Sequence, residues 1–144
     1  MTKFSRVLLL LCIWIIGSGA PQAAHAQSNF FEGKTIRLIV GFTAGGGYDA
    51  YTRTIGRHMG KHISGNPAII VENMPGAGSM ISANYIYKAA KPDGLTIGHF
   101  IGGLFLQQLL GKPGIEFDAA KFNYVGVPAQ DNFVLGIAKS TGIV

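Results

Sequence analysis

The sequence of 144 residues has a single cysteine, Cys12, and only seven acidic residues. Cys12 lies in an N-terminal segment that we expect to be removed, which would leave the mature chain without thiol or disulfide chemistry. The twelve basic residues form no run and are not interleaved with aromatic residues, which argues against nucleic-acid binding. The formal net charge of +5 instead indicates a solvated surface with a mild bias toward anionic ligands.

Long hydrophobic runs are also lacking. The apolar run 7–16 is too short to cross a bilayer, which needs about 20 apolar residues. It follows the basic residues Lys3 and Arg6 and precedes a small-x-small site that ends at Ala26. This order predicts a cleavable signal peptide over residues 1–26 and a periplasmic mature chain beginning at Gln27. No twin arginine is present, so export of a folded, cofactor-loaded protein is not indicated.

A glycine turn organises the remaining sequence. The β-branched run Ile36–Val40 is typical of a buried parallel strand, and Gly45, Gly46 and Gly47 follow it shortly before a helical pattern. Such a turn brings backbone N–H groups close to a ligand, at a helix N-terminus whose dipole favours an anion. The pattern therefore predicts an anion site.

The remaining patterns alternate between strands and helices. We expect strands at 35–42, 68–72, 95–100, 124–127 and 133–138, and helices at 48–62, 79–90 and 104–110. Apolar residues recur along single faces of the first two helices, namely Tyr51, Ile55 and Met59, and Ile81, Tyr85 and Ala89. This alternation predicts a parallel sheet covered on both faces, with the glycine turns along one edge.

A dinucleotide site is the main competing interpretation. Gly45, Gly47 and Ala50 nearly complete the glycine fingerprint, and Glu72 stands where an acid could hold a ribose. The signal peptide argues against this interpretation, and so does the second glycine turn, which lies where the ribose pocket should open.

Other catalytic or metal sites find little support. His58 and His62 are one helical turn apart, but no third metal ligand is evident, and basic residues suit a helix C-terminus. Ser79 has no His and Asp in a suggestive order, and we interpret it as a helix N-cap. We therefore expect a protein that is not an enzyme and that uses no metal or cofactor.

Four ordered motifs carry a family resemblance: Ile36-Arg-Leu-Ile-Val40, Gly45-Gly-Gly-x-Asp49-x-x-x-Arg53, Val71-Glu-Asn-x-Pro-Gly-Ala-Gly78 and Lys91-Pro-Asp-Gly-x-Thr96. Together they resemble the periplasmic substrate-binding receptors (Bug-type) of tripartite tricarboxylate transporters. The resemblance implies a periplasmic-binding-protein-like α/β lobe at 27–122, with a mostly parallel sheet flanked by helices. Residues 123–144 would begin a second lobe that is largely missing, since family members are about twice as long. The family usually has proline at the position of Gly41 and a Pro-Pro pair at Thr43-Ala44, so the first turn is expected to be looser here.

The resemblance also implies a function and a site. The receptor would capture a small carboxylate, deliver it to membrane permease subunits and act as a monomer when full length. Two alternatives stay open, a nucleotide-dependent oxidoreductase and a truncated remnant that binds nothing, and the identity of the carboxylate is undetermined. The candidate ligand-binding residues are Phe42, Thr43, Ala44, Gly45, Gly46, Gly47, Tyr48, Asp49, Pro75, Gly76, Ala77, Gly78, Ser79 and His99.

Overall fold

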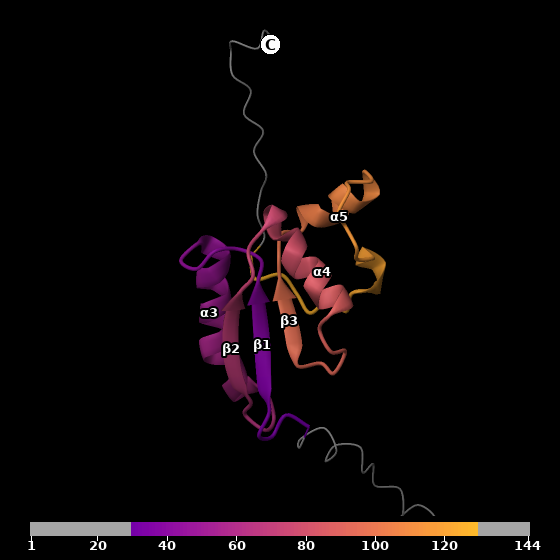
Figure 1. Ribbon diagram of the computed structural model, residues 1–144. Coiled ribbons are helices and arrows are strands. Elements are labelled where there is room, and N and C mark those ends of the chain that lie inside the picture. Colours follow the sequence, from indigo (N-terminus) through magenta and orange to yellow (C-terminus); the bar gives the residue numbers. More distant parts are fainter. Residues whose placement is uncertain (1–29, 130–144) are drawn as a thin grey trace, which may run out of the picture.

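The structure, a computed structural model, describes residues 30–129 of the chain (Figure 1). The predicted signal peptide and the predicted strand at 133–138 lie outside these residues. Strands β1 (Thr35–Val40), β2 (Ala68–Asn73) and β3 (Thr96–His99) alternate with helices α3 (Gly47–Met59), α4 (Met80–Lys88) and α5 (Gly103–Leu109). Short 3-10 turns cover Gly60–His62, Ala77–Ser79 and Ala119–Lys121. No helix within 30–129 has the length and hydrophobicity needed to cross a membrane.

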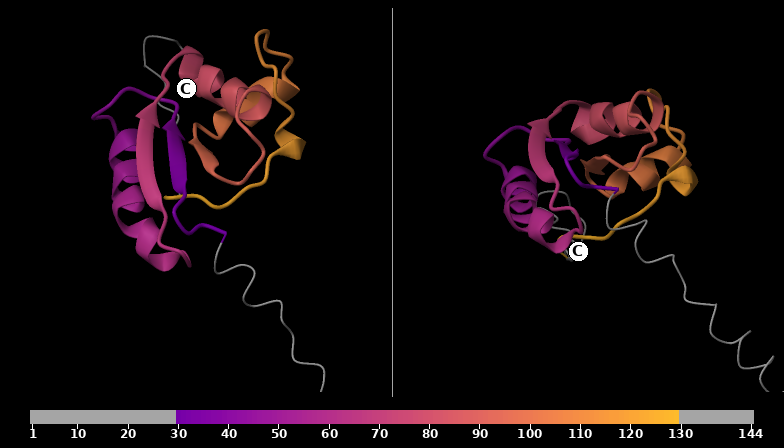
Figure 2. Two further views of the ribbon diagram at one scale, coloured as in Figure 1. Left: turned by 60° about the horizontal axis from the view of Figure 1, so that its bottom comes forward. Right: turned by 90° about the horizontal axis from the view of Figure 1, so that it is seen from below.

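The three strands form a parallel sheet in the order β2-β1-β3. Val40 at the end of β1 is in register with Asn73 and with His99, so the three carboxyl ends meet at one edge. Helix α3 packs against β1 and β2, whereas α4 contacts β3 and lies on the other face of the sheet (Figures 1 and 2). The central strand is the core of the sheet, with Ile36, Leu38, Ile39 and Val40 all buried. The predicted α/β fold with a parallel sheet flanked by helices is confirmed.

Helix α3 buries a different face from the one its apolar residues suggest. Tyr51 and Ile55 are 52% and 38% exposed, whereas Asp49 and Thr52 are buried. The helix approaches the sheet through Gly56, where an added Cβ would lie 3.2 Å from Ile69 Cγ2. A helix face of small residues allows this close approach, and side chains of the sheet pack directly against the helix backbone at Gly56.

Helix α4 repeats this arrangement. Ile81 is 50% exposed, whereas Ser82 and Ala83 are fully buried. The Ser82 hydroxyl donates to the carbonyl of Ser79 at 2.8 Å, which satisfies the buried polar group. Tyr85 contacts the sheet through its hydroxyl, which accepts a 3.1 Å hydrogen bond from Arg37 Nη1.

A second small core lies beside α4. Ala83, Leu104 and Phe117 form its buried centre, and aromatic side chains including Phe100 and Phe122 pack around it. The chain then continues without secondary structure, so the predicted strand at 124–127 is wrong. In this segment Val125 and Val127 are both more than 80% exposed, and none of the described strands pairs with it. A segment with high strand propensity does not form a strand unless it pairs with a neighbouring strand.

Candidate functional site

The first glycine turn is open to solvent. It joins β1 to α3, and its residues Thr43, Ala44, Gly45, Gly46 and Gly47 are all exposed. Gly45 has φ +85°, a conformation that glycine adopts without strain. Gly46 is the N-cap of α3 and has no side-chain cap, so the start of the helix is accessible to an anion.

Asp49, a predicted ligand-binding residue, points into the protein instead. Its side chain is only 5% exposed and accepts hydrogen bonds from Gly45 N at 2.8 Å, Arg53 Nε at 2.9 Å and Asn73 Nδ2 at 2.9 Å. These donors, with Arg53 the strongest, hold the pKa of the Asp49 carboxyl well below its usual range. Asp49 thus acts as a fixed internal anion that holds the turn.

Asn73 and Arg53 complete this network, and sequence reasoning assigned neither of them a role. Asn73 Nδ2 also donates to the carbonyl of Phe42 at 2.9 Å, and Asn73 Oδ1 accepts from Arg53 Nη2 at 2.9 Å. The end of β2 is therefore tied to the first turn and to the first two helical turns of α3. Both residues lie within the family motifs given above, and this placement could have indicated that they have a role at the turn.

The second glycine turn buries its serine. Ser79 is fully buried, and its Oγ accepts a 3.1 Å hydrogen bond from the backbone N–H of Ile101. It stands at the N-cap position of α4, as predicted, but its side chain makes no cap hydrogen bond. The two turns touch where Gly41 meets Ser79, since a Cβ added at Gly41 would lie 2.2 Å from Ser79 Cβ. Of the other predicted residues here, Pro75, Ala77 and Gly78 are exposed and Gly76 is half-buried.

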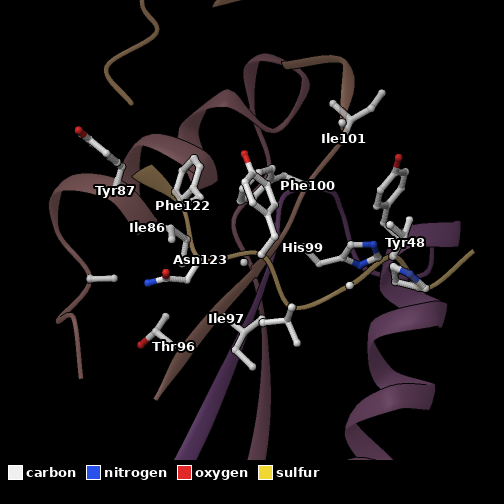
Figure 3. Close-up of a pocket in the computed structure, with 18 of the residues that line it drawn as sticks. Tyr48, Ile86, Tyr87, Thr96, Ile97, His99, Phe100, Ile101, Phe122 and Asn123 are labelled. Carbon is white, nitrogen blue, oxygen red and sulfur yellow. The ribbon is translucent and has the colours of Figure 1, made fainter. Parts of the chain in front are cut away.

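A cavity of about 1090 Å³ opens beside the first turn, between β3 and the segment 121–129 (Figure 3). Among the predicted site residues, Gly47, Tyr48 and His99 line this cavity, whereas the residues of the second turn do not. That one carboxylate takes donors from both turns stays a prediction. The lining side chains within the described chain include Lys88, Lys91 and Lys121 and no carboxylate.

His99 and Tyr48 lie side by side at the α3 end of this cavity (Figure 3), with ring centroids 4.8 Å apart. Phe42 stacks on Tyr48 at 4.4 Å, so a predicted residue of the turn supports the tyrosine ring. His99 Nδ1 is 2.6 Å from Thr52 Oγ1. Burial lowers the pKa of His99, and the carbonyl of Tyr48 offsets part of this effect.

The structure gives the competing sites no support. Glu72, the proposed ribose acid, accepts two 2.7 Å hydrogen bonds from Arg37, so this carboxylate is engaged within the sheet. His58 and His62 are exposed near the C-terminal end of α3, away from the carboxyl edge of the sheet. Within the described residues, no three His, Cys, Asp or Glu side chains gather closely enough to hold a metal ion.

These observations define an α/β domain with an open, anion-accessible turn next to a basic, partly aromatic cavity. Comparisons with known proteins identify relatives of this chain. The chain is 42% identical over 107 residues to the "UPF0065 protein in gbd 5'region" of Cupriavidus necator, covering 74% of this chain and 31% of that protein. A UPF0065 protein of Bordetella bronchiseptica is 30% identical over 117 residues, covering 81% of this chain and 33% of its own length.

The UPF0065 proteins are the Bug family, so the resemblance to a Bug-type receptor, over an N-terminal part only, is confirmed. The chain spans about a third of the length of these two relatives. No protein-family model matches it. A solved structure described as "Structure of a periplasmic transporter" is 36% identical, with a TM-score of 0.42, and covers 46% of this chain and 21% of that one.

Proposed function

We propose that this chain is the solute-binding part of a periplasmic receptor that captures a small carboxylate. The receptor delivers the solute to the membrane permease subunits of a tripartite tricarboxylate-type transporter. It is a binding protein rather than an enzyme, works without a cofactor or nucleic acid, and is monomeric when full length. The observation that carries the proposal is the exposed first turn, which offers the N-terminus of α3 beside the cavity.

The electrostatics of the turn favour a carboxylate. Backbone N–H groups at a helix start donate hydrogen bonds to an anion, and the helix dipole adds to the attraction. The one acidic side chain in the first turn of the helix, Asp49, faces inward and is neutralised by Arg53. A solute at the exposed side therefore meets backbone donors beside a cavity that no carboxylate of the described residues lines. Of the three lysines that line the cavity, Lys88 and Lys121 are paired with Glu116 and Asp118.

The test is a single valine substitution in the turn. Gly46→Val places a side chain at the mouth of the anion site, and its Cβ meets only the Thr43 carbonyl oxygen, at an ordinary 3.5 Å. Since Gly46 has extended φ and ψ, −78° and 172°, we expect the fold to be kept and carboxylate binding to be lost. Gly103→Val is the matched control, because Gly103 also lies at a helix start, with nothing within 4 Å of an added Cβ, but it begins α5 and is not part of the first turn.

Binding is measured by solute-observed NMR titration of purified 27–144 protein and its variants with citrate, succinate and malate, alongside NAD and NADP. The proposal predicts binding of at least one carboxylate by the unmodified chain and by Gly103→Val, and none by Gly46→Val. Equal binding by all three proteins would show that the turn is not the site. Binding of NAD or NADP alone would favour the oxidoreductase, and binding of no solute would favour the remnant.

A further inference from the structure

The position of one proton fixes how His99 meets the cavity. Thr52 Oγ1 donates to the carbonyl of Tyr48, four residues earlier on α3, at 2.7 Å. A carbonyl can only accept, so the single hydroxyl proton of Thr52 is committed to this bond. Thr52 is buried, 3% exposed, so water does not readily replace the carbonyl.

The imidazole must then be the donor in its short contact with Thr52. Because the hydroxyl oxygen has no second proton to give, Nδ1 carries a hydrogen and donates it to Thr52 Oγ1 across 2.6 Å. In a neutral imidazole only one nitrogen is protonated. The neutral ring of His99 therefore has Nδ1–H and a bare Nε2, which is a hydrogen-bond acceptor.

This acceptor belongs to the cavity. Nδ1 faces Thr52 on α3, so Nε2 lies on the other side of the ring, and His99 is one of the residues that line the cavity (Figure 3). The surroundings keep the ring neutral at physiological pH, since burial lowers its pKa. The charged side chains that line the same cavity are lysines, and none is acidic.

We propose that His99 is a specificity-determining residue that selects hydroxycarboxylates. The solute's carboxylate binds at the first turn, and its hydroxyl donates to His99 Nε2. This rests on the proposed function. An ammonium donor is disfavoured, because no anion among the described residues lines the cavity whereas Lys91 does. Lys88 and Lys121 also line it, but they pair with Glu116 and Asp118. Thr52 is a positioning residue, which acts by holding the imidazole in the accepting tautomer.

The binding test compares solutes that differ by one hydroxyl. The two enantiomers of malate, succinate and methoxysuccinate are titrated against the 27–144 protein at pH 8, where His99 is neutral. We expect one malate enantiomer to bind roughly fivefold tighter than succinate, the effect of about one net hydrogen bond, and methoxysuccinate to lose this gain. The preference should vanish in His99→Ala and return in part in His99→Gln, whose amide oxygen can accept.

A second variant tests the tautomer while keeping the imidazole. In Thr52→Val the hydroxyl acceptor for Nδ1–H is gone and only the Tyr48 carbonyl remains as an acceptor on this side. The Nε2–H form should therefore become more populated, and the preference for the hydroxyl-bearing solute should fall. Thr54→Val is the matched control, because Thr54 makes the same hydroxyl bond four residues back, to the Ala50 carbonyl at 2.9 Å, on an exposed face. Thr54→Val should prefer malate over succinate by the same factor as the unmodified chain.

Nitrogen-15 NMR of the imidazoles at pH 8 gives a readout that needs no solute. The His99 signals, assigned by their loss in His99→Gln, should show the Nδ1–H tautomer, and Thr52→Val should shift them toward Nε2–H. An Nε2–H tautomer in the unmodified chain overturns the inference. Equal binding of malate and succinate also overturns the inference but leaves the proposed function intact. Binding of no carboxylate overturns both the inference and the proposed function.

Discussion

The contact between the two turns yields a sharp stability prediction at Gly41. Replacing Gly41 by alanine puts a Cβ 2.2 Å from Ser79 Cβ, 2.6 Å from Ser82 Oγ and 3.1 Å from Ser79 Cα. The Ser82 hydroxyl can rotate, but Ser79 is fully buried with φ +68°, so its Cβ cannot move without the backbone. Overpacking of this kind costs roughly 1–3 kcal/mol, and we expect about 3 kcal/mol because backbone is involved.

A loss of this size is easy to measure. At about 4–8 °C per kcal/mol for a domain of 60–100 residues, it lowers Tm by more than 10 °C. Urea unfolding followed by far-UV circular dichroism gives the free energy of unfolding at 25 °C. Gly47→Ala serves as the control, because its Cβ meets nothing within 4 Å and alanine at a helix start should change stability by less than about 1 kcal/mol.

A double-mutant cycle identifies the cause. Ser79→Gly removes the opposing Cβ and relieves the left-handed backbone, at the cost of the acceptor for Ile101 N–H. If the clash is real, Gly41→Ala should cost at least about 1 kcal/mol less in the Ser79→Gly background. Additive effects within about 0.5 kcal/mol, or a Gly41→Ala protein as stable as the unmodified one, would refute the packing argument.

Two further predictions concern pH and affinity. Because the pKa of His99 is lowered on folding, its contribution to stability is present above the unfolded-state pKa of about 6.5 and is lost as pH falls below it. The stability difference between the unmodified chain and His99→Gln should therefore shrink on acidification from pH 7.5 to pH 5, and a growing difference would contradict this sign. The affinity of 27–144 for carboxylates should be millimolar or weaker, since three or four hydrogen bonds on an exposed turn compete with water and must offset roughly 4 kcal/mol or more of association entropy. Micromolar binding by a monomer in the same titrations would show that the exposed turn is sufficient for strong capture.

The fold could be predicted because its main signals are local. The β1 strand begins at Thr35, as expected, and its apolar run is interrupted only by Arg37. The three α-helices within residues 30–129 were placed within a few residues. The buried faces of α3 and α4 were missed because the exposed stripes, such as Tyr51 and Ile55, are the apolar ones. The informative signal was the recurrence of small residues at Thr52, Gly56 and Gly60, which permits a closer approach to the sheet than large side chains allow.

The role of Asp49 could also have been inferred from the sequence. It is the third helical residue after the N-cap Gly46, a position from which an acid folds back onto backbone N–H groups at the helix start. In the structure it does so onto Gly45 N. Its other two partners, Arg53 and Asn73, could not all be found locally, because Asn73 comes from β2 and meets Asp49 only once the sheet has formed.

The order of the strands in the sheet explains why only the first glycine turn lies beside the cavity. This order could not be predicted from the sequence patterns. From β1 the chain leaves to one face of the sheet through α3, whereas β3 is followed by α5, which packs with α4 on the other face. In parallel α/β sheets a crevice opens at the carboxyl edge between two adjacent strands whose connections diverge in this way, here β1 and β3. Tyr48 follows β1 and His99 ends β3, so the two residues that meet at the cavity come from the two sides of this crevice. The second turn follows β2, the strand on the far side of β1, and its Ser79 is buried against Gly41 and the backbone N–H of Ile101. A solute is therefore expected to bind between the first turn and the end of β3, with the second turn supporting the first from behind.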